Sequence, residues 1–172
     1  MKYAVVERER RFFPVDAVDL STASRVMQIE DRYIDGTRLR LRTVLEPGKN
    51  VVRKLGQKVR FTPGSPSALV HTTMYLDEAE HTLLANLPAV SLHKTRHVLR
   101  LADGTDVAVD VFADTLAGLT LAEIDLGPDG ALSQPLPTWL GLEVTEIEAF
   151  TGYALACLEP DELASLLTSY NR

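Results

Sequence analysis

Residues 94–126 read KTRHVLRLADGTDVAVDVFADTLAGLTLAEIDL, and this stretch decides how the chain folds. Charged and apolar residues alternate along much of it with a period of two, which is the period of a β-strand with one buried face. Asp103-Gly104 separates two of the alternating segments and is a strong signal for a hairpin turn. We predict strands over 94–101, 106–112 and 119–126, the first two paired as an antiparallel hairpin.

Working outward from this stretch, the same alternation predicts strands in the first half of the chain. They lie at 3–13, 38–44, 50–61 and 69–76, and Gly56 interrupts the third, as in a hairpin. Helical signals are fewer. Asp77 with Glu80 three residues later resembles a capping box. The predicted helices cover 77–87, 145–158 and 160–170, with a short one near 19–27. The fold class is therefore α+β, with a mostly antiparallel sheet.

The composition excludes several classes of protein. The chain has 172 residues, a length typical of one domain, and 45% of them are apolar, as in an ordinary globular protein. Its net charge of −6 disfavours a general nucleic-acid binder. No apolar run approaches the roughly 18 residues of a membrane span, and charged residues stand where a signal peptide would have its apolar core. With a single cysteine, Cys157, we expect a cytoplasmic protein without nucleic-acid or membrane partners.

The charged residues of the predicted strands are segregated on shared faces. Side chains at positions i and i+2 point to the same side of a strand. The resulting sets are Glu7, Glu9 and Arg11; Arg38, Arg40 and Arg42; Lys94 and Arg96; Asp106 and Asp110; and Glu123 and Asp125. One interpretation is a solvated sheet face over an apolar core. The other is a barrel with its charged face inward, where the charges would bind a polyanion together with Mg²⁺ or Mn²⁺.

In their order and spacing these motifs resemble the CYTH domain, the family of triphosphate tunnel metalloenzymes. The family signature E-x-E-x-K is matched by Glu7-Arg8-Glu9-Arg10-Arg11, its second-strand arginines by Arg38 to Arg42, and a following lysine by Lys54. Residues 94–126 resemble its K-x-R, D-x-F and E-x-E strands, and WLGLEVTE at 139–146 resembles the turn into its penultimate helix. The resemblance covers residues 3–158 of what we expect to be a single CYTH domain over 1–172, in which 159–172 form a helical extension.

The resemblance implies an eight-stranded antiparallel β-barrel, or tunnel, with flanking helices, and a metal-dependent enzyme that acts on triphosphate groups. Mg²⁺ or Mn²⁺ would be held by Glu7, Glu9, Asp110, Glu123 and Asp125. The triphosphate would be bound by Arg11, Arg38, Arg40, Arg42, Lys54, Lys94 and Arg96, and the catalytic residues would be Glu7, Glu9 and Arg11. Arg11 stands where the family has lysine, and because arginine stays protonated it cannot act as a base. His71 and Thr73 stand where the family often has a further acidic pair.

The function that follows is hydrolysis of the phosphoanhydride bond of a small triphosphate, with inorganic triphosphate as the first expectation. Three alternatives stay open: an adenylate cyclase, an activity like that of thiamine triphosphatase, and a module that binds polyphosphate or nucleotide without catalysis. A second copy of the chain would cover outward apolar positions, so a homodimer is also open.

Overall fold

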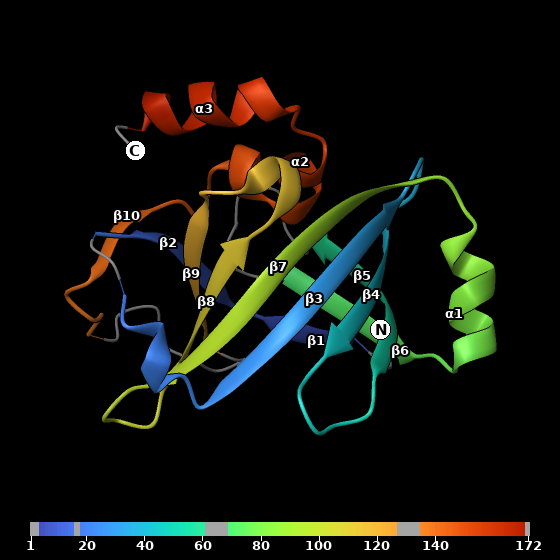
Figure 1. The fold of residues 1–172 in the computed structure, drawn as a ribbon, viewed down its shortest axis with the longest axis horizontal. Coiled ribbons are helices and arrows are strands. Elements are labelled where there is room, and N and C mark those ends of the chain that lie inside the picture. The colour runs from blue at the N-terminus through green and yellow to red at the C-terminus, as the bar shows by residue number, and fades with distance from the viewer. Residues whose placement is uncertain (1–3, 16–17, 61–68, 127–134, 171–172) are drawn as a thin grey trace.

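The fold is dominated by antiparallel strands. The computed structural model describes residues 4–15, 18–60, 69–126 and 135–170. In this part of the chain the strands are β1 (Ala4–Glu7), β2 (Glu9–Pro14), β3 (Arg25–Ile34), β4 (Leu39–Leu45), β5 (Val52–Arg60), β6 (Leu69–Tyr75), β7 (Ala89–Arg100), β8 (Asp106–Phe112), β9 (Thr120–Asp125) and β10 (Leu140–Glu143) (Figure 1). The helices are α1 (Glu78–Ala85), α2 (Gly152–Ala156) and α3 (Pro160–Ser169), with single 3-10 turns η1 (Leu20–Thr22), η2 (Asp114–Leu116) and η3 (Glu148–Phe150).

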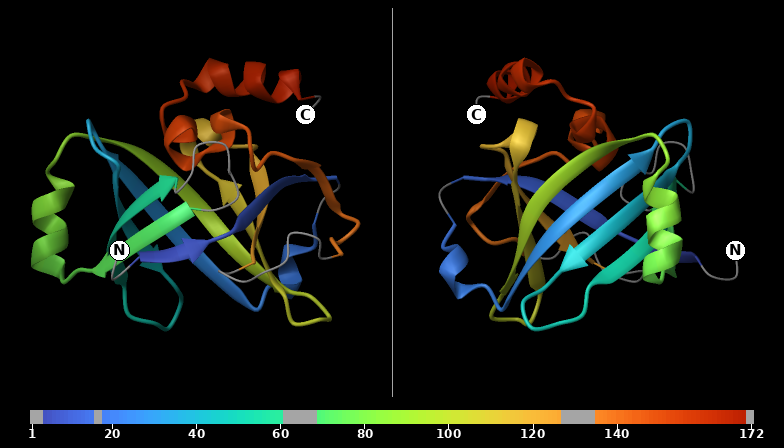
Figure 2. Two further views of the ribbon diagram at one scale, coloured as in Figure 1. Left: turned by 180° about the vertical axis from the view of Figure 1, so that it is seen from behind. Right: turned by 45° about the vertical axis from the view of Figure 1, so that its right-hand side comes forward.

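All these strands form one sheet, which the N-terminal segment turns into a tunnel. The hydrogen-bonded order is β1-β6-β5-β4-β3-β7-β8-β9-β2-β10, so the ladder itself is open at β1 and β10. However, only Arg8 separates β1 from β2 along the chain. Because β1 pairs with β6 and β2 pairs with β9, the chain brings the two ends of the sheet together (Figure 2). If β1 and β2 are taken as one strand and the four-residue β10 is set aside, the described strands number the predicted eight.

Alternation along the strands gives the sheet a charged inner face and an apolar outer face. Outside, Val107, Val109 and Ile124 are buried in a cluster that Trp139 and Leu140 cover. Leu41 and Leu55 are buried elsewhere on the outside, where Leu84 of α1 packs against them. At one end of the strands, η3, α2 and α3 cover inward-facing side chains of β7, β8 and β9 through a cluster that contains Leu92, Phe112, Leu121, Phe150, Leu155 and Leu163. The two C-terminal helices lie together at this end in Figure 1.

Most of the predicted elements are present, and three predictions were wrong. Residues 52–60 form one continuous strand and not a hairpin, because Gly56 sits inside the tunnel opposite Thr73 in the ladder. The predicted short helix near 19–27 is only the turn η1, and the next residues begin β3, a ten-residue strand between β4 and β7. The predicted helix over 145–158 is a 3-10 turn followed by a five-residue helix. No helix in the described ranges is long and apolar enough to cross a membrane.

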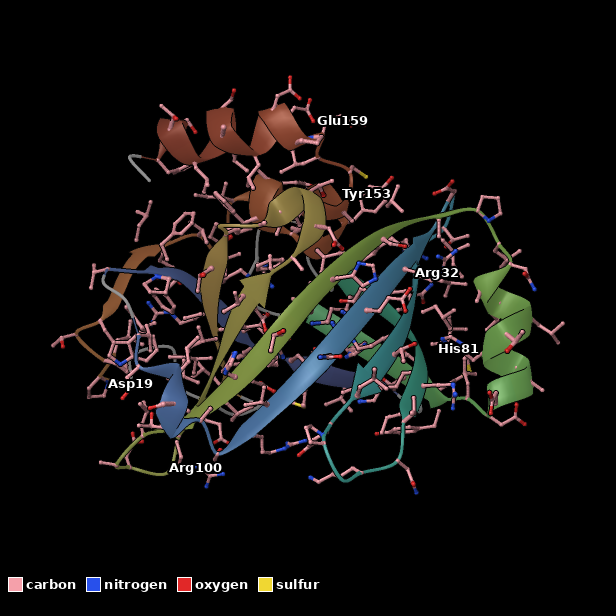
Figure 3. All side chains as sticks on the ribbon, in the orientation of Figure 1. Asp19, Arg32, His81, Arg100, Tyr153 and Glu159 are labelled. Atoms are coloured by element: carbon pink, nitrogen blue, oxygen red, sulfur yellow. The ribbon has the colours of Figure 1, made fainter. Side chains whose placement is uncertain are left out.

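Helix α1 begins as its sequence predicts. The Asp77 side chain accepts a hydrogen bond from the Glu80 backbone N–H at 2.8 Å, and Glu80 Oε2 accepts one from the Asp77 N–H at 3.0 Å. His81 points from α1 toward β4, where its Nε2 lies 3.0 Å from Thr43 Oγ1, and Arg32 donates to the Ala85 carbonyl at the helix end (Figure 3).

We expect Asp77→Ala to lower the free energy of unfolding by about 1 kcal/mol, measured by urea denaturation, because the helix loses its N-terminal cap. An unchanged denaturation midpoint would contradict this role of the cap.

Candidate active site

A cavity of about 720 Å³ occupies the interior of the tunnel. This volume is in the range of pockets that enclose a small organic ligand. All twelve residues that the motifs single out line it: Glu7, Glu9, Arg11, Arg38, Arg40, Arg42, Lys54, Lys94, Arg96, Asp110, Glu123 and Asp125. Arg38 lies just before β4, and the others come from seven strands, so the fold gathers residues that are up to 118 positions apart in the sequence. The structure therefore shows that the charged face of the sheet points inward.

The basic wall of the cavity consists of Arg38, Arg40, Arg42 and Lys54, next to one buried carboxylate. Arg42 donates from Nε and Nη2 to the two oxygens of Asp31, both at 2.6 Å, and Arg40 Nε lies 3.4 Å from the same carboxylate. Asp31 is only 1% exposed. Burial alone would raise the pKa of Asp31, but the charges of Arg42 and Arg40 hold it below its ordinary value. Asp31 thus holds Arg42 in place through two hydrogen bonds and is the nearby countercharge of Arg40, whose Nε is buried without a hydrogen bond.

Lys94 and Arg96 share Asp110. Lys94 Nζ donates to Asp110 Oδ2 at 2.6 Å, and Arg96 donates to both carboxylate oxygens at 2.7 Å. Burial lowers the pKa of Lys94 to about 8, although the charge of Asp110 opposes this shift. Asp110 therefore accepts three hydrogen bonds from cations in this structure, and the metal-ligand role that the resemblance implies for it stays a prediction.

The carboxylate wall consists of Glu7, Glu9, Glu123 and Asp125, and Lys58 lies among its members. Glu9 pairs with Asp125 across the β2–β9 ladder, and Arg11 pairs with Glu123. Lys58 Nζ donates to Glu9 Oε1 at 2.6 Å and lies 3.0 Å from Glu7 Oε2. Burial and the nearby charge of Glu123 raise the pKa of Glu9. For Glu123 burial acts in the same direction, but Arg96 and Arg11 hold its pKa well below the ordinary value.

His71 lies on β6 beside this wall. Its Nδ1 donates to Glu7 Oε1 at 2.6 Å, and its Nε2 is 3.2 Å from Thr73 Oγ1. Burial works against ionisation of Glu7, but the hydrogen bond with His71 and the charge of Lys58 lower its pKa to about 2. The position that is often acidic in the family therefore holds a neighbouring carboxylate in place.

Two cations of the basic wall have no carboxylate partner within the described residues. No described acidic side chain forms an ion pair with Arg38 or Lys54, while the other cations that line the cavity each have one. Lys54 Nζ lies 5.3 Å from the centre of the Tyr75 ring. Burial and the neighbouring arginines lower the pKa of Lys54. These two side chains can accept an anion without first giving up an ion pair.

Two residues of the site, Asp31 and Lys58, were not predicted from the sequence. The contact of His71 with Glu7 was not predicted either. A signal existed for each. Asp31 follows Met27 and Ile29 at a spacing of two, so it continues the buried face of β3. Lys58 is four residues after Lys54 and shares its face once 52–60 is one strand. His71 faces Lys58 directly in the β5–β6 ladder.

The donor set is of the kind that a hard divalent cation prefers, although it is not assembled around one. Within the described residues no three His, Cys, Asp or Glu side chains converge as a ready metal site. The carboxylate wall nevertheless offers only oxygen ligands, and Glu9 and Glu123 repel each other strongly enough to affect the pKa of Glu9. Glu7 Oε2 is buried and accepts no well-oriented hydrogen bond, although Lys58 Nζ lies 3.0 Å away. A divalent cation would relieve both the repulsion and the unmet acceptor, so these residues fit Mg²⁺ or Mn²⁺.

The segment 145–156, which we call the cap, closes one end of the cavity. It lines the cavity with Thr145, Glu148, Phe150, Thr151, Gly152, Tyr153 and Leu155. Tyr153 stands at the upper end of β7 in Figure 3, and its ring meets that of Tyr33 edge to face at 5.9 Å. Gly152 is pressed against the same tyrosine, since a Cβ added at this position would lie 1.9 Å from Tyr33 Oη.

We expect Gly152→Ala to destabilise the protein by about 1–3 kcal/mol, because the new methyl group forces the cap or the Tyr33 side chain to move. Thermal unfolding measures the change. Tyr33→Phe removes the clashing oxygen, so the double variant Gly152→Ala/Tyr33→Phe should lose less stability than the sum of the single changes. Strictly additive losses would contradict the contact.

No protein-family model and no curated protein matches the chain. Among solved structures, the crystal structure of the inorganic triphosphatase NE1496 is 26% identical, covers 90% of this chain and 96% of its own, and superposes with a TM-score of 0.58. A second crystal structure of NE1496, described as a hypothetical protein, gives a TM-score of 0.59 at the same identity.

The structure of the PH1819 protein from Pyrococcus horikoshii OT3 is 16% identical with a TM-score of 0.50, over 96% of this chain and 86% of that one, which supports the fold alone. The chain therefore has a CYTH-like tunnel fold, and the family resemblance of its motifs, that of the triphosphate tunnel metalloenzymes, is confirmed.

Proposed function

We propose that this protein is a metal-dependent triphosphatase that hydrolyses a phosphoanhydride bond of a small triphosphate, with inorganic triphosphate as its main substrate. One observation carries the proposal: the twelve motif residues, from both ends of the sequence, line a single cavity. The similarity to an inorganic triphosphatase over 90% of the chain supports it. A linear triphosphate carries several negative charges, and the eight Lys and Arg side chains that line the cavity match them.

The basic residues would bind the phosphates and stabilise the charge that develops as the bond breaks. Arg38 and Lys54 have no described carboxylate partner, so we assign them the first contact with the anion. Arg42 is held in direction by Asp31, which also lies beside Arg40, and Lys94 and Arg96 are held by Asp110. Cations fixed in this way need little rearrangement when charge shifts onto the leaving phosphate, which is the main source of catalysis in phosphoryl transfer.

The carboxylate wall would hold Mg²⁺ or Mn²⁺ through Glu7, Glu9, Glu123 and Asp125. The bound ion would neutralise phosphate charge and activate a water molecule. Lys58, which now lies between Glu7 and Glu9, would turn to the phosphates when the carboxylates bind the ion. The signature motif implies that Glu7 and Glu9 are catalytic. We expect their catalytic contribution to be that they hold the metal ion, and so its positive charge, beside the phosphates.

The apolar part of the cavity favours a second candidate substrate, an organic triphosphate. Tyr33, Leu92, Phe112, Phe150 and Leu155 line the cavity at the end that the cap closes. Inorganic triphosphate has no group that would use this surface, whereas an aromatic substituent such as that of thiamine or a nucleoside would.

Phosphate release from inorganic triphosphate, ATP and thiamine triphosphate, each with Mg²⁺, Mn²⁺ or EDTA, tests the proposal. We expect metal-dependent turnover that is fastest with inorganic triphosphate. Faster turnover of an organic triphosphate would select the second candidate, and formation of cyclic AMP from ATP would identify a cyclase. Tight binding of triphosphate without phosphate release would identify a binding module and overturn the proposal.

A further inference from the structure

Arg11 makes a contact that its place in the signature motif does not require. Its guanidinium Nη1 donates to the carbonyl oxygen of Phe150 at 2.8 Å, in the cap. Its Nη2 lies 3.5 Å from Glu123 Oε2 and 4.0 Å from Glu9 Oε2, in the carboxylate wall. One side chain thus joins the wall of the cavity to the segment that closes it.

The Phe150 carbonyl lies where an unpaired acceptor would be costly. Phe150 is completely buried, and its ring packs edge to face against Phe13 at 5.1 Å and against Tyr170 at 5.2 Å. These contacts fix the ring, and the hydrogen bond from Arg11 satisfies the backbone next to it. If this buried carbonyl lost its hydrogen-bond donor, the folded state would be destabilised.

The backbone of Arg11 is attached to the same part of the chain. Its N–H donates to Thr145 Oγ1 at 2.9 Å, and its carbonyl accepts a hydrogen bond from the Val144 N–H at 2.8 Å. The cap is therefore held by β2 at its first residue through the backbone and at its middle through the Arg11 side chain.

Only arginine can make the two side-chain contacts together. The guanidinium presents separate N–H groups in a rigid fork, whereas lysine offers one nitrogen at the end of a flexible stem. Of the two groups it joins, the carboxylate wall would change its charge on binding a metal ion, and the cap borders the cavity. The position of the cap is therefore coupled to the carboxylate wall through a single residue.

We propose that Arg11 is a positioning residue, which holds the cap over the cavity by linking the Phe150 carbonyl to Glu123. In this role it acts on the substrate through the cap, and the direct phosphate contact expected from the signature motif is not needed. The proposal concerns the folded protein alone, except for its kinetic consequence, which rests on the proposed triphosphatase function.

Hydrogen exchange of the ligand-free protein tests the proposal by reporting how often the cap opens. In Arg11→Lys and Arg11→Gln we expect amides in 148–157 to exchange roughly tenfold faster or more, since the hydrogen bond to Phe150 is lost. Amides of β3 and β7, in the middle of the sheet, should change much less. The matched control is Arg96→Lys. Arg96 also contacts Glu123, at 3.3 Å, but its hydrogen bonds go to the carboxylates of Asp110 and Glu123, whereas Arg11 also bonds the cap.

Three results would overturn the proposal: unchanged exchange in 148–157, an equal increase throughout the sheet, or the same increase in Arg96→Lys. Arg11→Lys keeps the charge and carries the test if Arg11→Gln does not fold. Steady-state kinetics with inorganic triphosphate give the second measurement. A loosened cap should raise KM several-fold while kcat falls less. If the wild-type protein shows no turnover, the proposed function fails, and the exchange experiment still decides the role of Arg11.

Discussion

Glu123→Gln is expected to lower kcat/KM for inorganic triphosphate on the order of a hundredfold or more while the protein stays folded. Glu123 is the carboxylate at which the site converges: Arg96 and Arg11 lie 3.3 and 3.5 Å from it, and its charge acts on Glu9. Glutamine keeps the shape but removes the negative charge that a metal ion requires. The remaining carboxylates of Asp110 and Glu9 still balance the two arginines, so circular dichroism should show an unchanged fold.

Asp106→Asn is the matched control for this prediction. Like Glu123, Asp106 is a strand carboxylate next to an arginine, Arg100, but it lies on β8, is exposed and does not line the cavity. Its loss should leave kcat/KM within about twofold of the wild-type value. Equal activity in Glu123→Gln and the wild-type protein would remove Glu123 from the site, and with it the proposed place of the metal ion.

The grouping of the inner-face residues was predictable because alternation along a strand decides which side chains share a face, and the family resemblance supplied the inward orientation. Glu7 and Glu9, Arg40 and Arg42, and Glu123 and Asp125 all lie at a spacing of two, and each pair lines the cavity. No knowledge of the other strands was needed for these assignments. What the alternation could not supply was the partner of each charge, since partners come from strands far away in the sequence.

Asp31 lies in a stretch of sequence where the alternation is not visible. The run Glu30-Asp31-Arg32 places three charged residues in succession, so the alternation is hidden although Met27, Ile29 and Asp31 share one face. Lys58 was not predicted for a different reason. Gly56 resembles a break in the strand, but it is a position on the inner face, where an added Cβ would lie 3.0 Å from His71 Nε2. In both cases the local pattern was ambiguous and the tertiary contact resolves it.

The conformation of the cap could not be predicted from its own sequence, because contacts with distant strands determine it. The regular helix expected over 145–158 is absent: the turn η3 has no side-chain cap, and the short helix α2 is capped by Thr151, whose Oγ1 accepts a hydrogen bond from the Ala154 N–H. The segment is shaped by Arg11 at Phe150 and by Tyr33 at Gly152. Both contacts come from strands more than a hundred residues earlier in the sequence, and no spacing within the segment encodes them.

Asp31→Asn is expected to lower the free energy of unfolding by about 3–5 kcal/mol at neutral pH, the largest effect on stability among these predictions. Asp31 is buried, and its carboxylate receives two hydrogen bonds of 2.6 Å from Arg42 and faces Arg40 at 3.4 Å. Asparagine fills the same space but leaves two arginines in the interior without a nearby countercharge. Urea denaturation measures the loss. Glu78→Gln, which removes an exposed partner of Arg53, is the control and should cost less than about 1 kcal/mol.

The loss in Asp31→Asn should also depend on pH and on anions. The folded-state pKa of Asp31 is lower than its unfolded value of about 4, so its contribution is fully present above pH 4 and is lost as the pH falls toward the folded value. The wild-type and variant curves of stability against pH should therefore converge in acid. Inorganic triphosphate offers Arg40 and Arg42 a new countercharge, so it should raise the melting temperature of the variant more than that of the wild-type protein. An equal shift for both would show that the two arginines do not bind the anion, and parallel pH curves would show that the ionised Asp31 does not stabilise the fold.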